Sequence, residues 1–229
     1  MKHNFWELIK NIFLPASCIG CGKMGSAFCR DCLALISLNR TPALFPAPSH
    51  ISALFFASSY ENPLLQKAVK ILKYPPFSKE IAKHLAFLII AHLALVDKPF
   101  QFTIGNSFKT KEWDYLFCPI PLHKKRLKWR GFNHAEEIAK HLAFASNIPM
   151  ATDILLKVRH TKPQVDLDGE ERKRNVRNCF ATAHQEKIQG KTIFLVDDVC
   201  TTGATLEEAA RTLKQAGAHR VYGLVVARG

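Results

Sequence analysis

Two adjacent carboxylates, followed by a loop of small and hydroxyl residues, form the stretch of this chain best suited to chemistry. The stretch reads Leu195-Val-Asp-Asp-Val-Cys-Thr-Thr-Gly-Ala-Thr-Leu206. Its loop consists of Thr201, Thr202, Gly203, Ala204 and Thr205. Successive backbone N–H groups and hydroxyls at a helix N-terminus can bind a phosphate monoester without any basic side chain. Gly203 also allows a positive φ and a close approach of the ligand.

The two acids of the stretch, Asp197 and Asp198, would repel that phosphate and must contact something else. A vicinal diol fits, since each carboxylate can accept a hydrogen bond from one ribose hydroxyl, with a hard cation nearby. The residues therefore predict a pocket for a ribose 5-phosphate. The alternative is that the acids simply end a strand and that Thr-Thr-Gly is an ordinary turn and cap, so the surrounding elements matter.

Those surrounding elements read as strand, loop, helix and strand. The apolar run from Ile193 to Val196 predicts a strand, and Val221 to Val226 predicts the next one. Between them, apolar residues recur at helical spacing, and Gly217 ends the helix; the apolar residues are Leu206, Ala209, Ala210 and Leu213. This is one βαβ unit of a parallel sheet, whose ligands bind beyond the carboxyl ends of the strands, where the loop must lie.

A second strand–loop–helix unit carries a basic loop. Its strand covers Asp114 to His123, and its loop runs from Lys124 to His134. If both loops open on the same side of the sheet, Arg126 and Arg130 would contact a diphosphate, because a guanidinium bonds two phosphate oxygens at once. The alternative for either arginine is a solvated basic surface.

The same unit contains two histidines that could activate an acceptor, His123 and His134. A loop histidine is more often an ordinary polar contact, so the sequence does not identify a base. Asn133, with Glu136 three positions later, forms a capping-box arrangement that begins the next helix.

A polar segment, residues 157–178, lies between that helix and the strand before the paired acids. Connections of this length are usually functional or mobile. We interpret the segment as a lid whose Arg172, Arg174 or Arg177 closes over bound substrate.

The region before the second unit predicts one strand and two helices. Ile51 to Tyr60 reads as a strand, and Asn62-Pro63 begins a helix that Tyr74 to Phe77 breaks. Ser78 then caps an apolar helix reaching about Val96, and Asp97 to Glu112 reads as a loop.

Four of the seven cysteines form two short pairs, Cys18 with Cys21 and Cys29 with Cys32. Two such pairs complete a tetrahedral four-thiolate shell, which predicts a structural zinc ion with no open position. An iron–sulfur cluster takes the same four thiolates and is the alternative. Disulfides are less expected, because the chain shows no export signal and a reducing cytosol keeps thiols free. We expect the other cysteines to be small buried residues; these are Cys118, Cys179 and Cys200.

Composition favours a packed, soluble protein. Of 229 residues, 48% are hydrophobic, and the net charge is +13. The longest apolar run, Leu85 to Val96, contains His92 and is too short to span a bilayer, so a cytoplasmic location is expected. Most of the positive excess lies outside the Leu195–Leu206 stretch, where it could face a diphosphate or a nucleic acid backbone.

The Leu195–Leu206 stretch resembles the signature of type I phosphoribosyltransferases, which binds 5-phosphoribosyl 1-diphosphate. Taken in order along the chain, several motifs resemble the ComF family of competence-associated phosphoribosyltransferase-like proteins. They are the four cysteines, the Ala68-to-Tyr74 stretch, Pro119-Ile-Pro-Leu-His123, Arg130-Gly-Phe-Asn133, Thr161 to Gln164, Arg174-Asn-Val176 and Leu195 to Leu206. The family pattern usually has Gln after Arg-Gly-Phe-Asn, where this chain has His134.

The resemblance implies an α/β fold with a type I phosphoribosyltransferase-like parallel sheet flanked by helices. We expect a zinc-binding module at residues 1–40 and a larger domain at residues 50–229, with its core at 113–229. Asp197 and Asp198 would hold the ribose, and Mg²⁺ would accompany phosphoribosyl diphosphate.

The resemblance also implies a role in natural transformation, with single-stranded DNA, a competence helicase-like ATPase and other competence proteins as partners. Without a transmembrane segment of its own, such a protein could still associate with the membrane uptake machinery. Whether it catalyses a transfer, and to which acceptor, the resemblance leaves open. Two alternatives remain: a nucleobase-salvage phosphoribosyltransferase and a non-catalytic adaptor for single-stranded DNA on the same fold.

Overall fold

The computed structural model describes residues 16–45, 47–75, 77–96, 115–161 and 169–229. The predicted loop from Asp97 to Glu112 and residues 162–168 of the predicted lid lie outside these described residues. Among the helices described, none has the length and apolar character needed to cross a bilayer.

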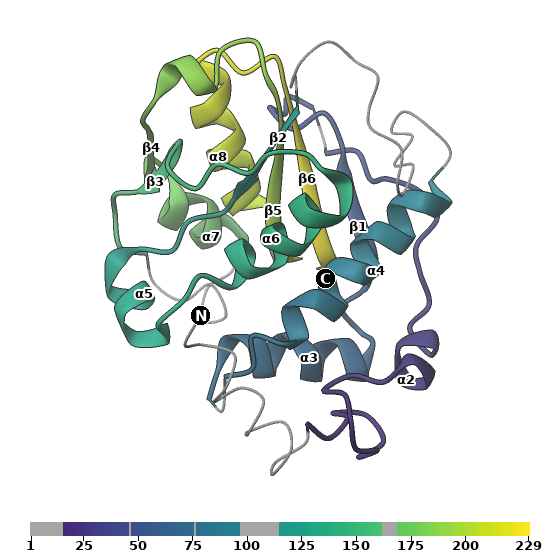
Figure 1. The fold of residues 1–229 in the computed structure, drawn as a ribbon. Coiled ribbons are helices and arrows are strands. Elements are labelled where there is room, and N and C mark those ends of the chain that lie inside the picture. The colour runs from purple at the N-terminus through teal and green to yellow at the C-terminus, as the bar shows by residue number, and fades with distance from the viewer. Residues whose placement is uncertain (1–15, 46, 76, 97–114, 162–168) are drawn as a thin grey trace.

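A four-stranded parallel sheet forms the centre of the fold (Figure 1). Its order is β1 (Leu54–Ser59), β6 (Arg220–Arg228), β5 (Thr192–Cys200) and β2 (Tyr115–Pro119). Each neighbouring pair is parallel, with Val196 of β5 opposite Leu224 of β6 and Pro119 of β2. Both units therefore contain the predicted strands, although the one predicted from Asp114 to His123 ends at Pro119. The carboxyl ends of β2 and β5 lie side by side.

Helices cover both faces of this sheet. Alternate residues of β5 point to opposite faces, as the pleat of a strand requires. Phe194 and Val196 belong to the core shared with α4 (Ile81–Leu95) and α6 (His134–Ser146). Ile193 and Leu195 belong to the core shared with α8 (Ala204–Gln215), whose apolar stripe is the one predicted from the sequence.

One further helix, α3 (Pro63–Lys73), lies beyond the carboxyl end of the sheet (Figure 1). It begins as predicted: Asn62 accepts hydrogen bonds from the backbone N–H groups of Leu64 and Leu65, with Pro63 in the first turn. Its buried residues Leu65, Ala68, Val69 and Leu72 face the core, so the C-terminal Lys73 is carried towards the end of β5.

The prediction that Ser78 caps the second apolar helix is wrong. Helix α4 begins at Ile81 with Glu80 at the N-cap position. The backbone N–H of Ser78 instead donates to the carbonyl of Ile71, which ties this residue to the end of α3.

The basic stretch after β2 is a helix and not the loop that we expected. Helix α5 (Lys124–Arg130) begins where the His123 ring accepts from the Lys125 N–H, and it ends at Gly131 with a φ of 80°. Lysine, arginine and leucine favour helices, and Gly131 supplies the left-handed cap, so short-range preferences explain the outcome. Asn133 caps α6 as predicted, whereas Glu136 pairs with Lys140.

The described part of the predicted lid is also more regular than a loop. It begins at the last residue of β3 (Leu155–Lys157) and contains α7 (Gly169–Val176). Strand β3 pairs antiparallel with β4 (Phe180–Thr182) beside α8. A short 3-10 turn, Gln185–Lys187, leads on to β5. Helix α7 is strongly polar, so it has no apolar periodicity by which the sequence could have revealed it.

Candidate functional site

A pocket of about 350 Å³ lies at the carboxyl ends of β2 and β5. Its walls come from the loop before α8, from α5, from the end of α3 and from β3. Pockets of this size hold small ligands such as sugar phosphates. The loop before α8 and the basic segment after β2 therefore open into one cavity, which is the condition under which a shared site was expected.

The loop of hydroxyl residues forms one wall of the pocket. Thr201, Gly203, Ala204 and Thr205 line it. Gly203 has a φ of 78° and stands at the N-cap position of α8, so a positive φ occurs where the sequence predicted it. Thr202 makes a local contact, in which its hydroxyl accepts from the Ala204 N–H at 3.4 Å.

Gly203 also meets an aromatic ring from a distant part of the chain. A Cβ atom at this position would overlap the ring of Phe45. Glycine is therefore needed here both for its backbone conformation and for the contact with Phe45.

The paired acids line the pocket but differ in their surroundings. Asp198 is 1% exposed, and its Oδ2 forms an ion pair with Lys73 Nζ at 2.8 Å. Burial favours a raised pKa for Asp198, but the charge of Lys73 together with the other groups and hydrogen bonds around the carboxylate holds the pKa below its ordinary value of 3.8. Asp197 is partly exposed, and its Oδ1 accepts from the Asp198 N–H. Asp197 is thus the more accessible carboxylate of the two.

His134 links these acids to a buried arginine. Arg130 Nη1 lies 2.6 Å from His134 Nδ1. Because a guanidinium only donates, Nδ1 must accept, and we assign the proton of the neutral ring to Nε2. Nε2 lies 3.4 Å from Asp197 Oδ1 and 3.6 Å from Asp198 Oδ2, so its N–H faces the acidic pair. In this state neither ring nitrogen has a lone pair free to act as a base.

The trio of His134, Asp197 and Asp198 does not form a good cation cage. Their ligand atoms lie within 4.8 Å of one another. However, the proton assigned to His134 Nε2 and the ion pair between Asp198 and Lys73 leave Asp197 as the available ligand. A Mg²⁺ site made by protein groups alone is not supported, since Mg²⁺ needs several oxygen ligands.

Four cations line the pocket: Lys73, Arg126, Arg130 and Lys157. The sequence predicted the two arginines and missed the two lysines. Burial lowers the pKa of both Arg130 and Lys157 from their ordinary values. A polyanion bound beside Arg130 and Lys157 would counteract this lowering of their pKa values, because opposite charge favours the protonated form.

The three lid arginines lie apart from this pocket. Arg174 and Arg177 are exposed, Arg172 is partly exposed, and the lining from the same segment comes from Lys157 and Thr161. The C-terminal end of α7 is anchored to α8, since buried Glu208 accepts from the Asn178 N–H at 2.6 Å. The closure of these arginines over a substrate stays a prediction.

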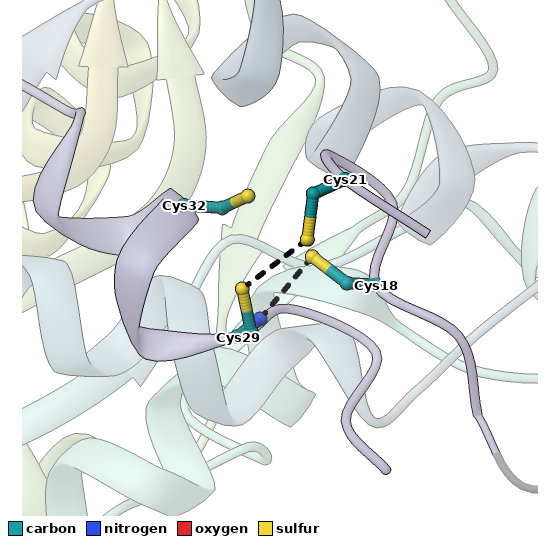
Figure 2. A group of neighbouring side chains, drawn as sticks. All are labelled: Cys18, Cys21, Cys29 and Cys32. Carbon is teal, nitrogen blue, oxygen red and sulfur yellow. Dashed lines mark hydrogen bonds between the residues drawn. The ribbon is translucent and has the colours of Figure 1, made fainter. Parts of the chain in front are cut away.

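The four paired cysteines point their sulfurs towards one another (Figure 2). All four sulfur atoms lie within 4.8 Å of one another, and Cys21 Sγ and Cys29 Sγ are 3.7 Å apart. A tetrahedral shell with Zn–S bonds of about 2.3 Å requires sulfur separations of about 3.8 Å. The spacing fits one ion better than an iron–sulfur cluster, in which the thiolates bind different irons and stand farther apart.

Backbone groups support this cysteine cluster (Cys18, Cys21, Cys29 and Cys32). Cys18 Sγ accepts from the N–H groups of Gly20 and Cys29 at 3.4 and 3.3 Å. Although burial opposes it, these hydrogen bonds lower the pKa of Cys18 to about 6, which favours the thiolate that a metal needs. A Cβ at Gly20 would lie 2.6 Å from Cys32 Sγ, so only glycine allows the close turn.

The remaining cysteines are buried, as predicted. Burial raises the pKa of Cys118 to about 12 and that of Cys200 to about 11. Cys200 lines the pocket but is therefore held as a neutral thiol.

The cysteine cluster is joined to the pocket by a connecting segment, residues 37–51, of which residue 46 is not described. The segment is fastened to the body by the Ser37 and Asn39 carbonyls, which lie 2.7 Å from Ser58 Oγ and 2.8 Å from His92 Nδ1. It then places Phe45 against Gly203. Farther on, Ser49 Oγ and the His50 N–H donate to Glu207 in the first turn of α8, at 2.7 and 2.8 Å.

Comparison with known proteins gives one family and several relatives. Residues 127–229 match the phosphoribosyl transferase domain. DNA utilization protein YhgH of Salmonella typhi is 35% identical over 168 residues, which cover 73% of this chain and 68% of that protein. Competence protein F of Haemophilus influenzae is 35% identical over 109 residues, 46% of this chain and 48% of that protein.

A third relative is competence protein ComFC of Bacillus subtilis. It is 30% identical over 155 residues, which cover 67% of this chain and 60% of that protein. The chain therefore spans about half the length of Competence protein F and somewhat more of YhgH and ComFC.

Proposed function

Because this chain belongs to the ComF family of competence and DNA utilization proteins, we propose that it binds 5-phosphoribosyl 1-diphosphate and acts in the uptake or use of DNA. The observation that carries the proposal is the shared pocket. It has a loop of amides and hydroxyls at Thr201–Thr205 and cations on the β2–α5 side, including Arg126 and Arg130.

The polarity of this pocket suits the two ends of the ligand. The 5-phosphate would accept from the N–H groups at the start of α8, where the helix dipole also favours an anion. The 1-diphosphate would lie against Arg126, Arg130 and Lys157, and Asp197 would accept from a ribose hydroxyl. Mg²⁺ enters the proposal only as the counter-ion that the diphosphate brings with it.

A transfer reaction at this site would break the bond between ribose C1 and the diphosphate and form a bond between C1 and a nitrogen nucleophile of the acceptor. The positive charge that develops on the sugar ring would be stabilised by nearby carboxylate, and the departing diphosphate by the cations. Asp197 is the carboxylate of this chain best placed for that role, because Asp198 is buried against Lys73.

The decisive experiment is calorimetric titration with phosphoribosyl diphosphate and Mg²⁺, using the full chain and its Asp197→Asn variant. We expect binding that weakens at least tenfold in the variant. Asp153→Asn is the matched control, because that acid pairs with Lys187 outside this pocket. Unchanged affinity in Asp197→Asn would contradict the ribose assignment, and absence of binding by the parent chain would contradict the proposal.

A non-catalytic adaptor for single-stranded DNA is the second candidate, and helix α5 favours it. Lys124, Lys125 and Lys128 are exposed on this helix beside the exposed ring of Trp129. Cations with an aromatic ring are typical of single-strand binding. This candidate predicts salt-dependent binding of an oligonucleotide that survives Asp197→Asn, whereas a nucleobase-salvage enzyme would support growth of a salvage-deficient host on a purine base.

The place of the protein in the cell is proposed from its relatives. A competence role would bring it together with single-stranded DNA, a helicase-like ATPase and other competence proteins at the uptake machinery. Co-purification of these proteins with the tagged full chain during transformation tests this part separately.

A further inference from the structure

The mouth of the pocket carries two large aromatic side chains that are not buried. Tyr74 is 46% exposed and Trp129 is 58% exposed, and both line the pocket. They come from different elements, since Tyr74 follows α3 and Trp129 lies on α5. Single exposed aromatic residues are common on proteins, but two that line the mouth of one pocket can both reach a ligand held there.

The indole of Trp129 is held in place without being covered. Phe77 packs its ring nearly perpendicular to Trp129, with centroids 5.6 Å apart. Phe77 packs in the same way on Phe132, with centroids 5.8 Å apart, and Phe132 is buried. The guanidinium carbon of Arg130 lies 6.0 Å from the Trp129 ring centroid. Trp129 is therefore supported by the core as a firm aromatic surface.

The groups deeper in the pocket indicate which planar ligand would use this surface. Arg126 and Lys157 supply positive charge, and the Thr201–Thr205 loop supplies amides and hydroxyls. A flat ring that is accompanied by phosphates and sugars is a nucleobase. Bases stack on tryptophan and tyrosine faces whatever their sequence, because every base has a π-face.

We propose that Tyr74 and Trp129 form a stacking subsite for a nucleobase at the mouth of the sugar-phosphate pocket. The base would come either free, as an acceptor beside the ribose, or as part of a single-stranded DNA chain. The proposal rests on the proposed function for the identity of the deeper ligand. Its test is separate, however, because stacking and sugar-phosphate binding are measured by different signals.

Tryptophan fluorescence provides the signal for stacking. The chain has three tryptophans, so replacing Trp6 and Trp113 by Phe leaves Trp129 as the reporter. Adenine with phosphoribosyl diphosphate, a short deoxyadenosine oligonucleotide and an abasic oligonucleotide of equal charge are titrated in turn. We expect the first or the second to quench the indole, which tells the two sources apart. Equal quenching by the abasic strand, or no quenching by any, overturns the proposal.

Affinity measurements on the full chain complete the test. Loss of a stacked base typically weakens binding by roughly tenfold or more. We expect this loss for Trp129→Ala and Tyr74→Ala, with most of the affinity kept in Trp129→Phe. Phe144→Ala is the matched control, because Phe144 is an aromatic residue that is 92% exposed on α6 and outside the pocket.

Calorimetry separates this result from the proposed function. Phosphoribosyl diphosphate alone should lose much less affinity than the base does in Trp129→Ala, because the deeper groups remain. Quenching by a base with no sugar-phosphate binding would support the subsite and contradict the proposed ligand. Equal base affinity in Trp129→Ala and the parent chain would overturn the subsite.

Discussion

Asp197 and Asp198 are neighbours in the sequence, yet the fold gives them different surroundings. Asp198 is buried against Lys73, whereas Asp197 remains partly exposed in the pocket. The prediction from sequence gave both acids the same role, because nothing in the neighbouring residues distinguishes them. The difference arises from α3, a helix more than a hundred residues earlier, which brings Lys73 to one of the two carboxylates.

We therefore predict that Asp198→Asn destabilises the fold by about 3 kcal/mol, because it leaves the charge of Lys73 unpaired. The double variant Asp198→Asn with Lys73→Met should recover part of this loss. Asp31→Asn, at an exposed acid, should have little effect. Denaturant unfolding measures all three, and a double variant less stable than Asp198→Asn would contradict the ion-pair explanation.

The ion pair between Asp198 and Lys73 also predicts that the stability of the fold depends on pH. The pKa of Asp198 is held below 3.8, so its contribution to stability is present above that value and is lost as the pH falls through the folded pKa. The pKa of Lys73 is raised above 10.5, although burial opposes this, because Asp198 and Asp197 outweigh it. The stability difference between the parent chain and Asp198→Asn should therefore be largest between about pH 4 and pH 10, as measured by thermal unfolding across that range.

His134 stands where the ComF pattern usually has Gln, and its contacts suggest why the two can exchange. An Nε2–H group faces the acids here, and a glutamine amide can also present an N–H. We predict that His134→Gln keeps phosphoribosyl diphosphate affinity within a few-fold, whereas His134→Leu weakens it roughly tenfold. Nitrogen-15 NMR of the parent ring should show the Nε2–H form. An Nδ1–H signal would contradict the contact with Arg130.

At the scale of elements, the strands were more predictable than the short helices. Buried parallel strands leave continuous apolar runs, so β5 and β6 could be placed from sequence. Helix α5 has few apolar positions, and α7 has hardly any, so neither shows a helical period. The sequence therefore predicted Arg126 and Arg130 as pocket residues, but it did not predict that a helix, α5, carries them.

The loop before α8 depends on an element that the sequence could not connect to it. A β-carbon at Gly203 would overlap Phe45, and the φ of 78° also disfavours any other residue. We predict that Gly203→Ala costs about 1–2 kcal/mol through φ and about 1–3 kcal/mol more through the overlap. Gly190→Ala is the matched control, because Gly190 has a φ of 73° with open space around it.

Removing the partner ring separates the two causes. In a Phe45→Ala background, Gly203→Ala should cost only as much as Gly190→Ala does. Chemical denaturation gives the free energies of unfolding. Equal costs of Gly203→Ala in both backgrounds would show that Phe45 does not press on the loop.

At the scale of the whole molecule, the cysteine cluster and the sheet share one core. Phe28, Cys18 and Cys32 are buried in the same cluster as Leu65 and Leu85. The sequence predicted the four thiolates because their spacing is local. It could not predict what the cluster packs against, since that depends on contacts between distant segments.

We predict that removing zinc destabilises the entire molecule and not the cluster alone. Each kcal/mol lost should lower the Tm by roughly 2–4 °C in a chain of this size. Thermal unfolding with and without a chelator, together with metal analysis, measures the effect. Cys29→Ser should lower the Tm in the same way, whereas the surface change Asp31→Asn should not. A fully folded protein that contains no zinc when purified and melts at the same temperature would contradict the prediction.

The connecting segment has a practical consequence for anyone who divides this protein. A fragment that starts near residue 50 would keep every group that lines the pocket at the ends of β2 and β5 but would lose Phe45 and Ser49. The loop before α8 would then lack its contact with Phe45. Weak ligand binding by such a fragment would therefore reflect the missing contacts and not the residues that line the pocket. A single protease cut in the connecting segment would be expected to weaken binding in the same way.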